Sequence, residues 1–116
     1  MSLVVSKQQP LKHYAWGGNC DAWNLVDEEA FSIKQERMPA GSSEEKHYHK
    51  KAQQFFYIIK GHSTFEIEGT CTNVAAREGI RIEAGKKHRV VNNTSGDVEF
   101  ILCSQPSTIN DRFNCP

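Results

Sequence analysis

The sequence predicts an all-β protein, organised as a sandwich or a barrel of short strands. Glycines suited to turns recur at short intervals along most of the chain, at Gly41, Gly61, Gly69, Gly79, Gly85 and Gly96. The segments between them are rich in Phe, Ile, Val, Thr and Tyr. Many short segments of this kind, bounded by turn residues, are typical of β-sandwiches and β-barrels. No long window has the periodicity of an amphipathic helix.

The strand pattern is clearest in five segments, at residues 54–60, 63–68, 70–76, 87–93 and 98–104. Successive side chains of a strand point to opposite faces, so Phe65 and Ile67 share one face of the second segment. Residues 21–31 are the one passable helix candidate. Both ends of the chain, 1–10 and 105–116, are expected to be irregular.

Length and charge restrict the classes of partner. A chain of 116 residues is expected to form a single domain spanning 1–116. Lys plus Arg and Asp plus Glu both number 14, so the formal net charge is zero. Nucleic acids and anionic membrane surfaces usually attract a basic excess, so we expect neither as a partner. The longest apolar run, 55–59, is far too short to span a membrane.

The expected location is the cytoplasm, because residues 1–6 lack the pattern of a secretory signal. The four cysteines, at positions 20, 71, 103 and 115, form no C-x-x-C pair. We therefore expect reduced thiols rather than a zinc ribbon or a redox motif. Cys71 and Cys103 lie in alternating apolar stretches and are expected to be small core residues.

Three histidines and a glutamine form a pattern that indicates a metal site. His47 and His49 are two residues apart, which places both imidazoles on one face of a strand. His88 lies on a later strand-like segment, and Gln54 offers a neutral carbonyl oxygen. Three imidazoles with one oxygen suit zinc, nickel, manganese or iron as a divalent ion, and they leave one or two coordination positions open.

Two segments carry a family resemblance. Residues 41–61, GSSEEKHYHKKAQQFFYIIKG, resemble the first cupin motif, with its glycine, His-x-His pair and closing glycine. Residues 79–92, GIRIEAGKKHRVVN, resemble the second motif, with its glycine, histidine and asparagine. The resemblance implies a double-stranded β-helix (the jelly-roll cupin barrel), a metal held by His47, His49, Gln54 and His88, and a homodimer.

The sequence departs from the cupin motifs at two positions. Gln54 stands where the first motif has a glutamate, and Glu83 stands where the second usually has a proline. The glutamine resembles that of some sugar-acting cupins, and it removes one negative charge from the site. A bound metal should then be a stronger Lewis acid, and less able to stabilise a ferric state.

Alternation extends the expected pocket beyond the ligands. Phe56 shares the face of Gln54, and Asn92 shares the face of His88. The expected substrate-binding residues are Arg37, Phe56, Asn92, Asp111 and Arg112. Barrel packing for Phe56 and a surface ion pair for Arg37 remain open as alternatives. The candidates for a general acid or base are Glu36, Glu45 and Asp111, whereas Tyr57 should face the other way.

The functional prediction is metal-assisted isomerisation, epimerisation or lyase-type chemistry on a small sugar or sugar acid. A ferrous dioxygenase is one alternative. A non-catalytic module that binds a sugar or a metal is the other. This fold supports many reactions, so the motifs alone do not decide among the three.

Overall fold

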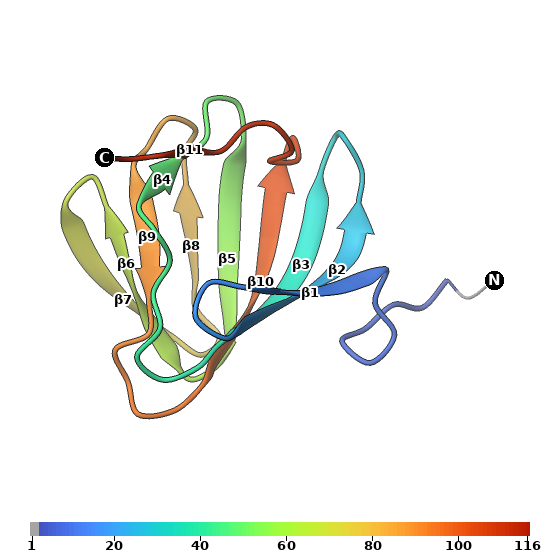
Figure 1. Cartoon of the computed structure of the whole chain (residues 1–116), viewed down its shortest axis with the longest axis horizontal. Coiled ribbons are helices and arrows are strands. Elements are labelled where there is room, and N and C mark those ends of the chain that lie inside the picture. Colours follow the sequence, from blue (N-terminus) through green and yellow to red (C-terminus); the bar gives the residue numbers. More distant parts are fainter. Residues whose placement is uncertain (1–2) are drawn as a thin grey trace.

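The computed structural model describes residues 3–116, and these residues form an all-β fold without helices. The described chain contains eleven strands (Figure 1). They are β1 (Lys12–Trp16), β2 (Cys20–Asp27), β3 (Ser32–Met38), β4 (His47–Tyr48), β5 (Gln53–Lys60), β6 (His62–Ile67), β7 (Thr70–Ala75), β8 (Gly79–Ile82), β9 (His88–Val91), β10 (Val98–Gln105) and β11 (Phe113–Asn114). No described helix could cross a lipid bilayer.

The strands form two antiparallel sheets, as predicted for a jelly roll. One sheet has six strands in the order β1-β2-β3-β10-β5-β8, and the other has five in the order β11-β4-β9-β6-β7. Neighbours in each sheet are often far apart in sequence, as for β3 and β10. Segments from both halves of the chain therefore meet at one end of the molecule, where the site described below lies.

The core lies between the two sheets. On β5, Phe56 and Ile58 point inward and are 3% and 0% exposed, whereas Phe55 and Tyr57 point outward and are 44% and 39% exposed. The Phe56 ring packs edge-on against Phe65 of the opposite sheet, with ring centroids 4.9 Å apart. Burial of these aromatic side chains, together with the edge-to-face contact, holds the two sheets against each other.

Two turns show why glycine is needed at their positions. Glu68 and Gly69 join β6 to β7 with φ values of 49° and 84°. Positive φ at both central residues is characteristic of a tight type I′ hairpin. Gly61 has a φ of 75°, and a Cβ there would lie 2.6 Å from the carbonyl oxygen of Asp97. No other residue type would fit at that position without displacing the backbone.

Three expectations about local structure are corrected. The helix candidate 21–31 is wrong, because Cys20–Asp27 is strand β2, paired on both sides with β1 and β3. The C-terminal segment is not wholly irregular, since β11 pairs with β4. Cys71 is exposed on β7 and Cys103 is half-buried, so neither is a core residue; Cys20 is the fully buried cysteine. All four thiols are free.

Candidate metal centre

The three predicted histidines converge at the open end of the fold. His47 on β4 lies directly opposite His88 on β9 in an antiparallel pair. Their ring centroids are 4.4 Å apart, and the His49 ring lies 4.9 Å from that of His47. Each residue offers a ligand nitrogen within 4.8 Å of the other two, so the cluster could hold a metal ion. All three side chains are buried.

Hydrogen bonds to backbone carbonyls fix the orientation of each ring. Nδ1 of His47 lies 2.8 Å from the Glu45 oxygen, Nδ1 of His49 lies 2.6 Å from that of Asp111, and Nδ1 of His88 lies 2.8 Å from that of Lys86. A carbonyl oxygen only accepts, so each Nδ1 carries the proton and each Nε2 keeps a free lone pair. This arrangement is typical of histidines that bind metals through Nε2.

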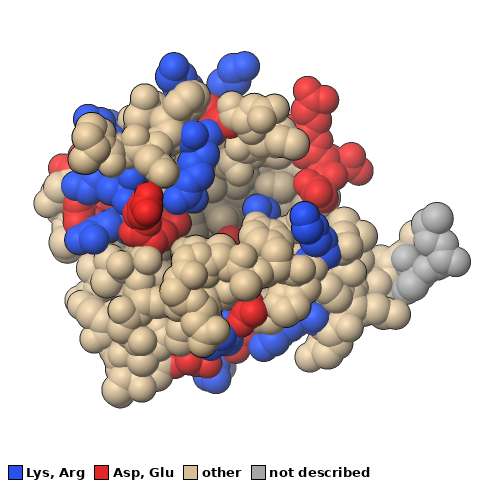
Figure 2. Space-filling model, viewed as in Figure 1, with Lys and Arg blue, Asp and Glu red and all other residues tan. Residues whose placement is uncertain are grey.

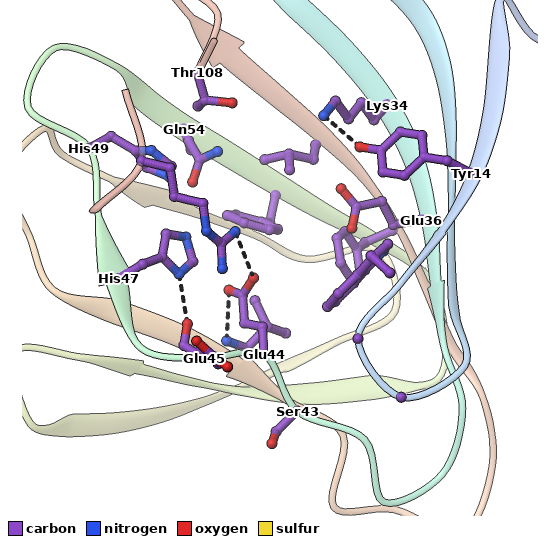
Figure 3. Close-up of a pocket in the computed structure, with 18 residues that line it drawn as sticks. Tyr14, Lys34, Glu36, Ser43, Glu44, Glu45, His47, His49, Gln54 and Thr108 are labelled. Carbon is purple, nitrogen blue, oxygen red and sulfur yellow. Dashed lines mark hydrogen bonds and ion pairs between the residues drawn. The ribbon is translucent and has the colours of Figure 1, made fainter. Parts of the chain in front are cut away.

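Gln54 adds an oxygen from the other sheet. Its Nε2 donates to Ser104 Oγ at 3.0 Å. This hydrogen bond fixes the orientation of the amide and leaves Oε1 as its free acceptor. Figure 3 shows this oxygen on the side of the histidines. Gln54 Oε1, His49 Nε2 and His88 Nε2 are all buried and have no hydrogen-bond partner among the described residues. Unpartnered buried polar atoms are rare, and three in one cluster fit a metal site.

The electrostatics of the cluster also suit a cation. Burial lowers the pKa of His47 to about 3 and that of His88 to about 4, and it lowers the pKa of His49 as well. The imidazoles are therefore neutral at physiological pH, which is the form that binds metals. Three neutral nitrogens and one neutral oxygen are a donor set for a borderline divalent ion.

The cluster opens into a pocket of about 510 Å³ between the sheets. Figure 2 shows the hollow, with Lys and Arg side chains along its rim. Its apolar lining comes largely from the inward faces of β5, β9 and β10, namely Phe56, Val90, Phe100 and Leu102. A pocket of this size with an apolar wall and a few polar groups suits a small organic ligand.

Two carboxyl groups line the same pocket, that of Glu36, which is buried, and that of Glu44, which is largely buried. Glu36 lies on the inward face of β3, and burial raises its pKa to about 7. Glu44 lies in the loop before β4, and burial, followed by the nearby Glu36, raises its pKa to about 8. Its Oε1 accepts a hydrogen bond from the Val90 amide at 3.1 Å. The sequence analysis missed Glu44, because only the pairing of its loop with β9 buries it.

Comparison with known proteins places the chain in a family. The cupin domain model matches residues 34–104, which is more than half of the chain. This chain is a cupin. The match covers β3 to β10 and therefore includes all four predicted metal-binding residues.

The individual proteins compared with this cupin have low sequence identity to it. An oxalate-binding protein of Thermotoga maritima is 26% identical over 89 residues, covering 72% of this chain and 74% of that protein. An RmlC-like cupin of Shewanella frigidimarina has a TM-score of 0.82 at 14% identity, covering 95% and 96% of the two chains. Pac13 of Streptomyces, a nucleoside dehydratase, has a TM-score of 0.77 at 12% identity, covering 90% and 83%. The two structural likenesses establish the fold alone.

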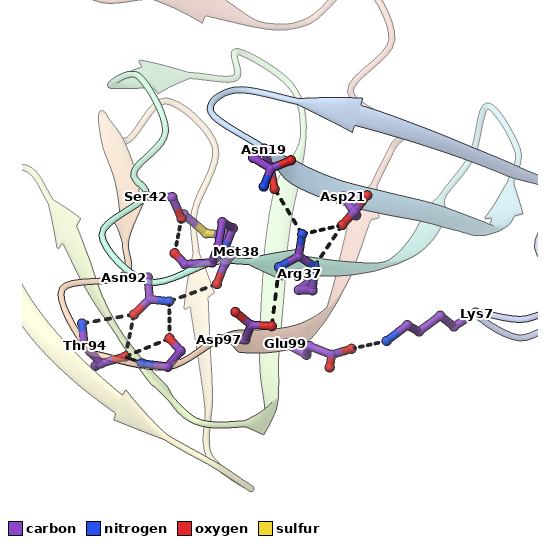
Figure 4. A network of polar contacts seen from close by, with 12 residues as sticks. Lys7, Asn19, Asp21, Arg37, Met38, Ser42, Asn92, Thr94, Asp97 and Glu99 are labelled. Atoms are coloured by element: carbon purple, nitrogen blue, oxygen red, sulfur yellow. Dashed lines mark hydrogen bonds and ion pairs between the residues drawn. The ribbon is translucent and has the colours of Figure 1, made fainter.

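Three predicted substrate-binding residues of this cupin lie outside the pocket lining, and Figure 4 shows two of them, Arg37 and Asn92. Arg37 is on the opposite face of β3 from Glu36 and pairs with Asp21 at 2.8 Å and Asp97 at 3.3 Å. Asn92 is fully buried, and its amide donates to the backbone oxygens of Met38 and Gly96. In the described structure both side chains hold strands and a loop together, and neither lines the pocket.

The remaining predicted residues divide between the pocket and its support. Phe56 and Arg112 line the pocket. Glu45 is exposed, and its carboxylate accepts a hydrogen bond from Asn114.

The Asp111 carboxylate accepts three hydrogen bonds, from the amides of residues 50, 51 and 52, at 2.9 to 3.0 Å. Burial acts to raise its pKa, but these hydrogen bonds outweigh burial and hold the pKa below its usual value. Of the three acid–base candidates, Glu36 alone is both buried in the pocket wall and unengaged.

Asp111 is expected to position His49. Its side chain anchors the C-terminal strap (residues 106–116) to the loop after His49, and its backbone carbonyl accepts the His49 Nδ1 proton. Asp111→Ala should cost about 2 kcal/mol of stability, since the three amides lose their acceptor. It should also lower metal affinity about 10–100-fold, because the carbonyl that orients His49 is no longer held in place.

Urea unfolding and metal titration would measure the two effects. Asn114→Ala is the matched control, because it removes a single exposed hydrogen bond from the same strap. An Asp111→Ala protein with unchanged metal affinity would show that the strap does not orient His49.

Proposed function

We propose that this cupin holds a divalent metal ion through His47, His49, His88 and Gln54 and uses it on a small, oxygen-rich ligand such as a sugar or sugar acid. The reaction class is isomerisation, epimerisation or lyase-type elimination. The observation that carries the proposal is the convergence of buried, unpartnered nitrogen and oxygen atoms on one point at the end of a pocket. When bound, such an ion acts as a Lewis acid that polarises a carbonyl or hydroxyl oxygen.

Glu36 is the residue best suited to move a proton. Its carboxyl group faces the pocket from the six-stranded sheet, across from the histidines (Figure 3). A pKa of about 7 makes both protonation states available at neutral pH, as a general acid–base residue requires. In an isomerisation, Glu36 would accept the proton from the hydroxyl-bearing carbon next to a carbonyl, leaving the electron pair on the substrate, and would return it to the former carbonyl carbon, while the hydroxyl proton passes to the former carbonyl oxygen.

Arg112 is suited to bind an anionic group of the ligand. Its guanidinium lines the pocket, and its one ion pair, to Glu44, is long at 3.9 Å. It makes no hydrogen bond to another residue in the described part of the chain. A planar group with five free donors is well matched to a carboxylate.

A non-catalytic binding role is the second candidate. It is supported by the relative from Thermotoga maritima, which is named for binding oxalate rather than for converting it. Such a role would use the same metal and Arg112 but would require no proton transfer by Glu36.

Elemental analysis of the purified protein is the first test. One equivalent of zinc, nickel or manganese per chain would support the proposal, and iron would favour oxygenation. Incubation of the metal-loaded protein with a panel of sugar acids in D₂O, followed by NMR, would then detect carbon-bound deuterium. Binding of sugar acids without any exchange would favour the non-catalytic role. A protein with no affinity for divalent metals would contradict both candidates.

We also propose that the protein forms a homodimer through the outer face of the six-stranded sheet. Four large apolar side chains lie on or beside this face and are 39–44% exposed, namely Phe31, Phe55, Tyr57 and Ile59. Contiguous apolar surface of this kind often marks a contact between chains. Tyr57→Glu should therefore shift the protein from dimer to monomer in sedimentation velocity, because it places a charge in the buried contact. A monomeric wild-type protein would contradict the proposal.

A further inference from the structure

The wall of the pocket opposite the histidines has its own set of polar groups. It is formed by Tyr14 of β1 with Lys34 and Glu36 of β3, and we call these three residues the β1–β3 wall. The strand register aligns Tyr14 with Ala22 and Ala22 with Glu36, so the tyrosine and the glutamate share one face across β2. Figure 3 shows the wall on the opposite side of the cavity from His47 and His49.

The wall residues leave much of their hydrogen-bonding capacity unused. Lys34 Nζ donates one proton to the Tyr14 hydroxyl at 2.8 Å, which leaves two ammonium protons and the phenolic proton free. Glu36 is 8% exposed, and its carboxyl group makes no hydrogen bond or ion pair with any residue between 3 and 116. Buried carboxyl groups are almost always hydrogen-bonded, so a lone one in a cavity wall indicates a ligand.

The two ionisable groups of the wall also fail to neutralise each other. Lys34 and Glu36 project into the same cavity, yet the ammonium bonds to the phenol and forms no ion pair with the glutamate. A hydrogen-bonded ammonium and phenol, with an unpaired carboxyl group beside them, offer donors and acceptors side by side. Neighbouring hydroxyl groups of a polyol, each both donor and acceptor, match such a surface.

We propose that the β1–β3 wall binds the hydroxyl groups of a ligand whose carboxylate end faces the histidine cluster. The pocket then selects polyhydroxylated carboxylates that are long enough to reach from the histidine cluster to the β1–β3 wall. Short acids fill the histidine end alone. This inference rests on the proposed function, because the cluster is taken to bind the acidic end.

Two acids that share the same reactive end provide the test. Glycolate and gluconate both have a carboxylate next to a hydroxyl-bearing carbon, but only gluconate carries the further hydroxyl groups. In calorimetric titrations of the zinc-loaded protein, gluconate should bind at least about tenfold more tightly than glycolate, as two or more added hydrogen bonds would give. Lys34→Met and Tyr14→Phe should each weaken gluconate binding about tenfold and leave glycolate binding within about twofold.

Lys12→Met is the matched control. Lys12 lies 5.7 Å from the Tyr14 ring and Lys34 lies 5.4 Å from it, but only Lys34 lines the pocket. The control should bind both acids as the wild type does. A purely structural role of the wall would weaken both acids equally and would overturn the proposal.

The remaining outcomes separate this proposal from the proposed function. If the protein binds glycolate but has no preference for gluconate, the proposal for the wall is overturned and the proposal for the metal site stands. Gluconate binding to a protein that takes up no zinc, if Lys34→Met weakens it, supports the wall and overturns the metal site. A protein that binds neither zinc nor gluconate overturns both.

Discussion

Replacing His88 with alanine is expected to abolish metal binding while leaving the fold intact. His88 is 1% exposed and supplies one of the three imidazoles of the cluster. Loss of a direct ligand should exceed the roughly 10–100-fold loss of affinity that follows mutation of outer partners. The two sheets should remain folded, because the aromatic contacts of Phe56 lie deeper between them. Elemental analysis and far-UV circular dichroism would measure the two properties.

His62→Ala is the control for this experiment. His62 is exposed at the start of β6 and is not part of the cluster. It should leave metal content and stability unchanged. If the His88→Ala protein retains a full equivalent of metal, then His88 is not a ligand and the assignment of the centre fails.

The metal-free protein is expected to lose stability as the pH rises from about 6.5 to 8. Burial raises the pKa of Glu36 from 4.5 to about 7, so between these values the folded state binds more protons than the unfolded state. Stability must therefore fall as the pH rises through this range, and Glu44 extends the range to about 8. The full contribution of Glu36 is on the order of 3 kcal/mol at 1.36 kcal/mol per pKa unit, and because most of it is lost between pH 4.5 and 6.5, only about 1 kcal/mol falls above pH 6.5.

The histidines act in the opposite sense. Burial holds the pKa of His47 near 3, against 6.5 for a free imidazole, so below about pH 6.5 the unfolded state binds more protons. Stability is then lost as the pH falls, and His88 acts in the same way. The two effects oppose each other between pH 4.5 and 6.5, so the metal-free protein should be most stable in that range.

Urea unfolding in the presence of a chelator, at intervals from pH 5 to 9, would test this dependence. Glu36→Gln should remove part of the decline above pH 6.5, because the neutral amide does not titrate. A wild-type protein whose stability rises between pH 6.5 and 8 would show that these carboxyl groups are not buried as described.

The candidate metal ligands were predictable because their positions depend on local rules. His47 and His49 share a face through the two-residue repeat of a strand, and motif spacing identified Gln54 and His88. The face of β3 could not be chosen in the same way, because Glu36 and Arg37 are both polar and either could have pointed inward. Only the pairing of β3 with β10 and β2 decides that Glu36 faces the pocket.

Strand β2 and the β1–β3 wall show a second limit. The segment around Trp23 looked passably helical, but pairing with two neighbouring strands determines its conformation. Lys34 and Tyr14 are 20 residues apart, and their hydrogen bond forms only because β1 and β3 flank β2. Contacts of this kind depend on the order of strands in the sheet, which the sequence pattern does not contain.

The four candidate ligands come from both layers of the fold, with His47 and His88 on the five-stranded sheet, His49 directly after β4, and Gln54 on the six-stranded sheet. An ion held by all four would link the two sheets at the end of the pocket. Because a ligand that binds only the folded state stabilises it by mass action, the melting temperature should climb with free metal concentration. Heating curves alone could then rank metals by how well they fit this centre.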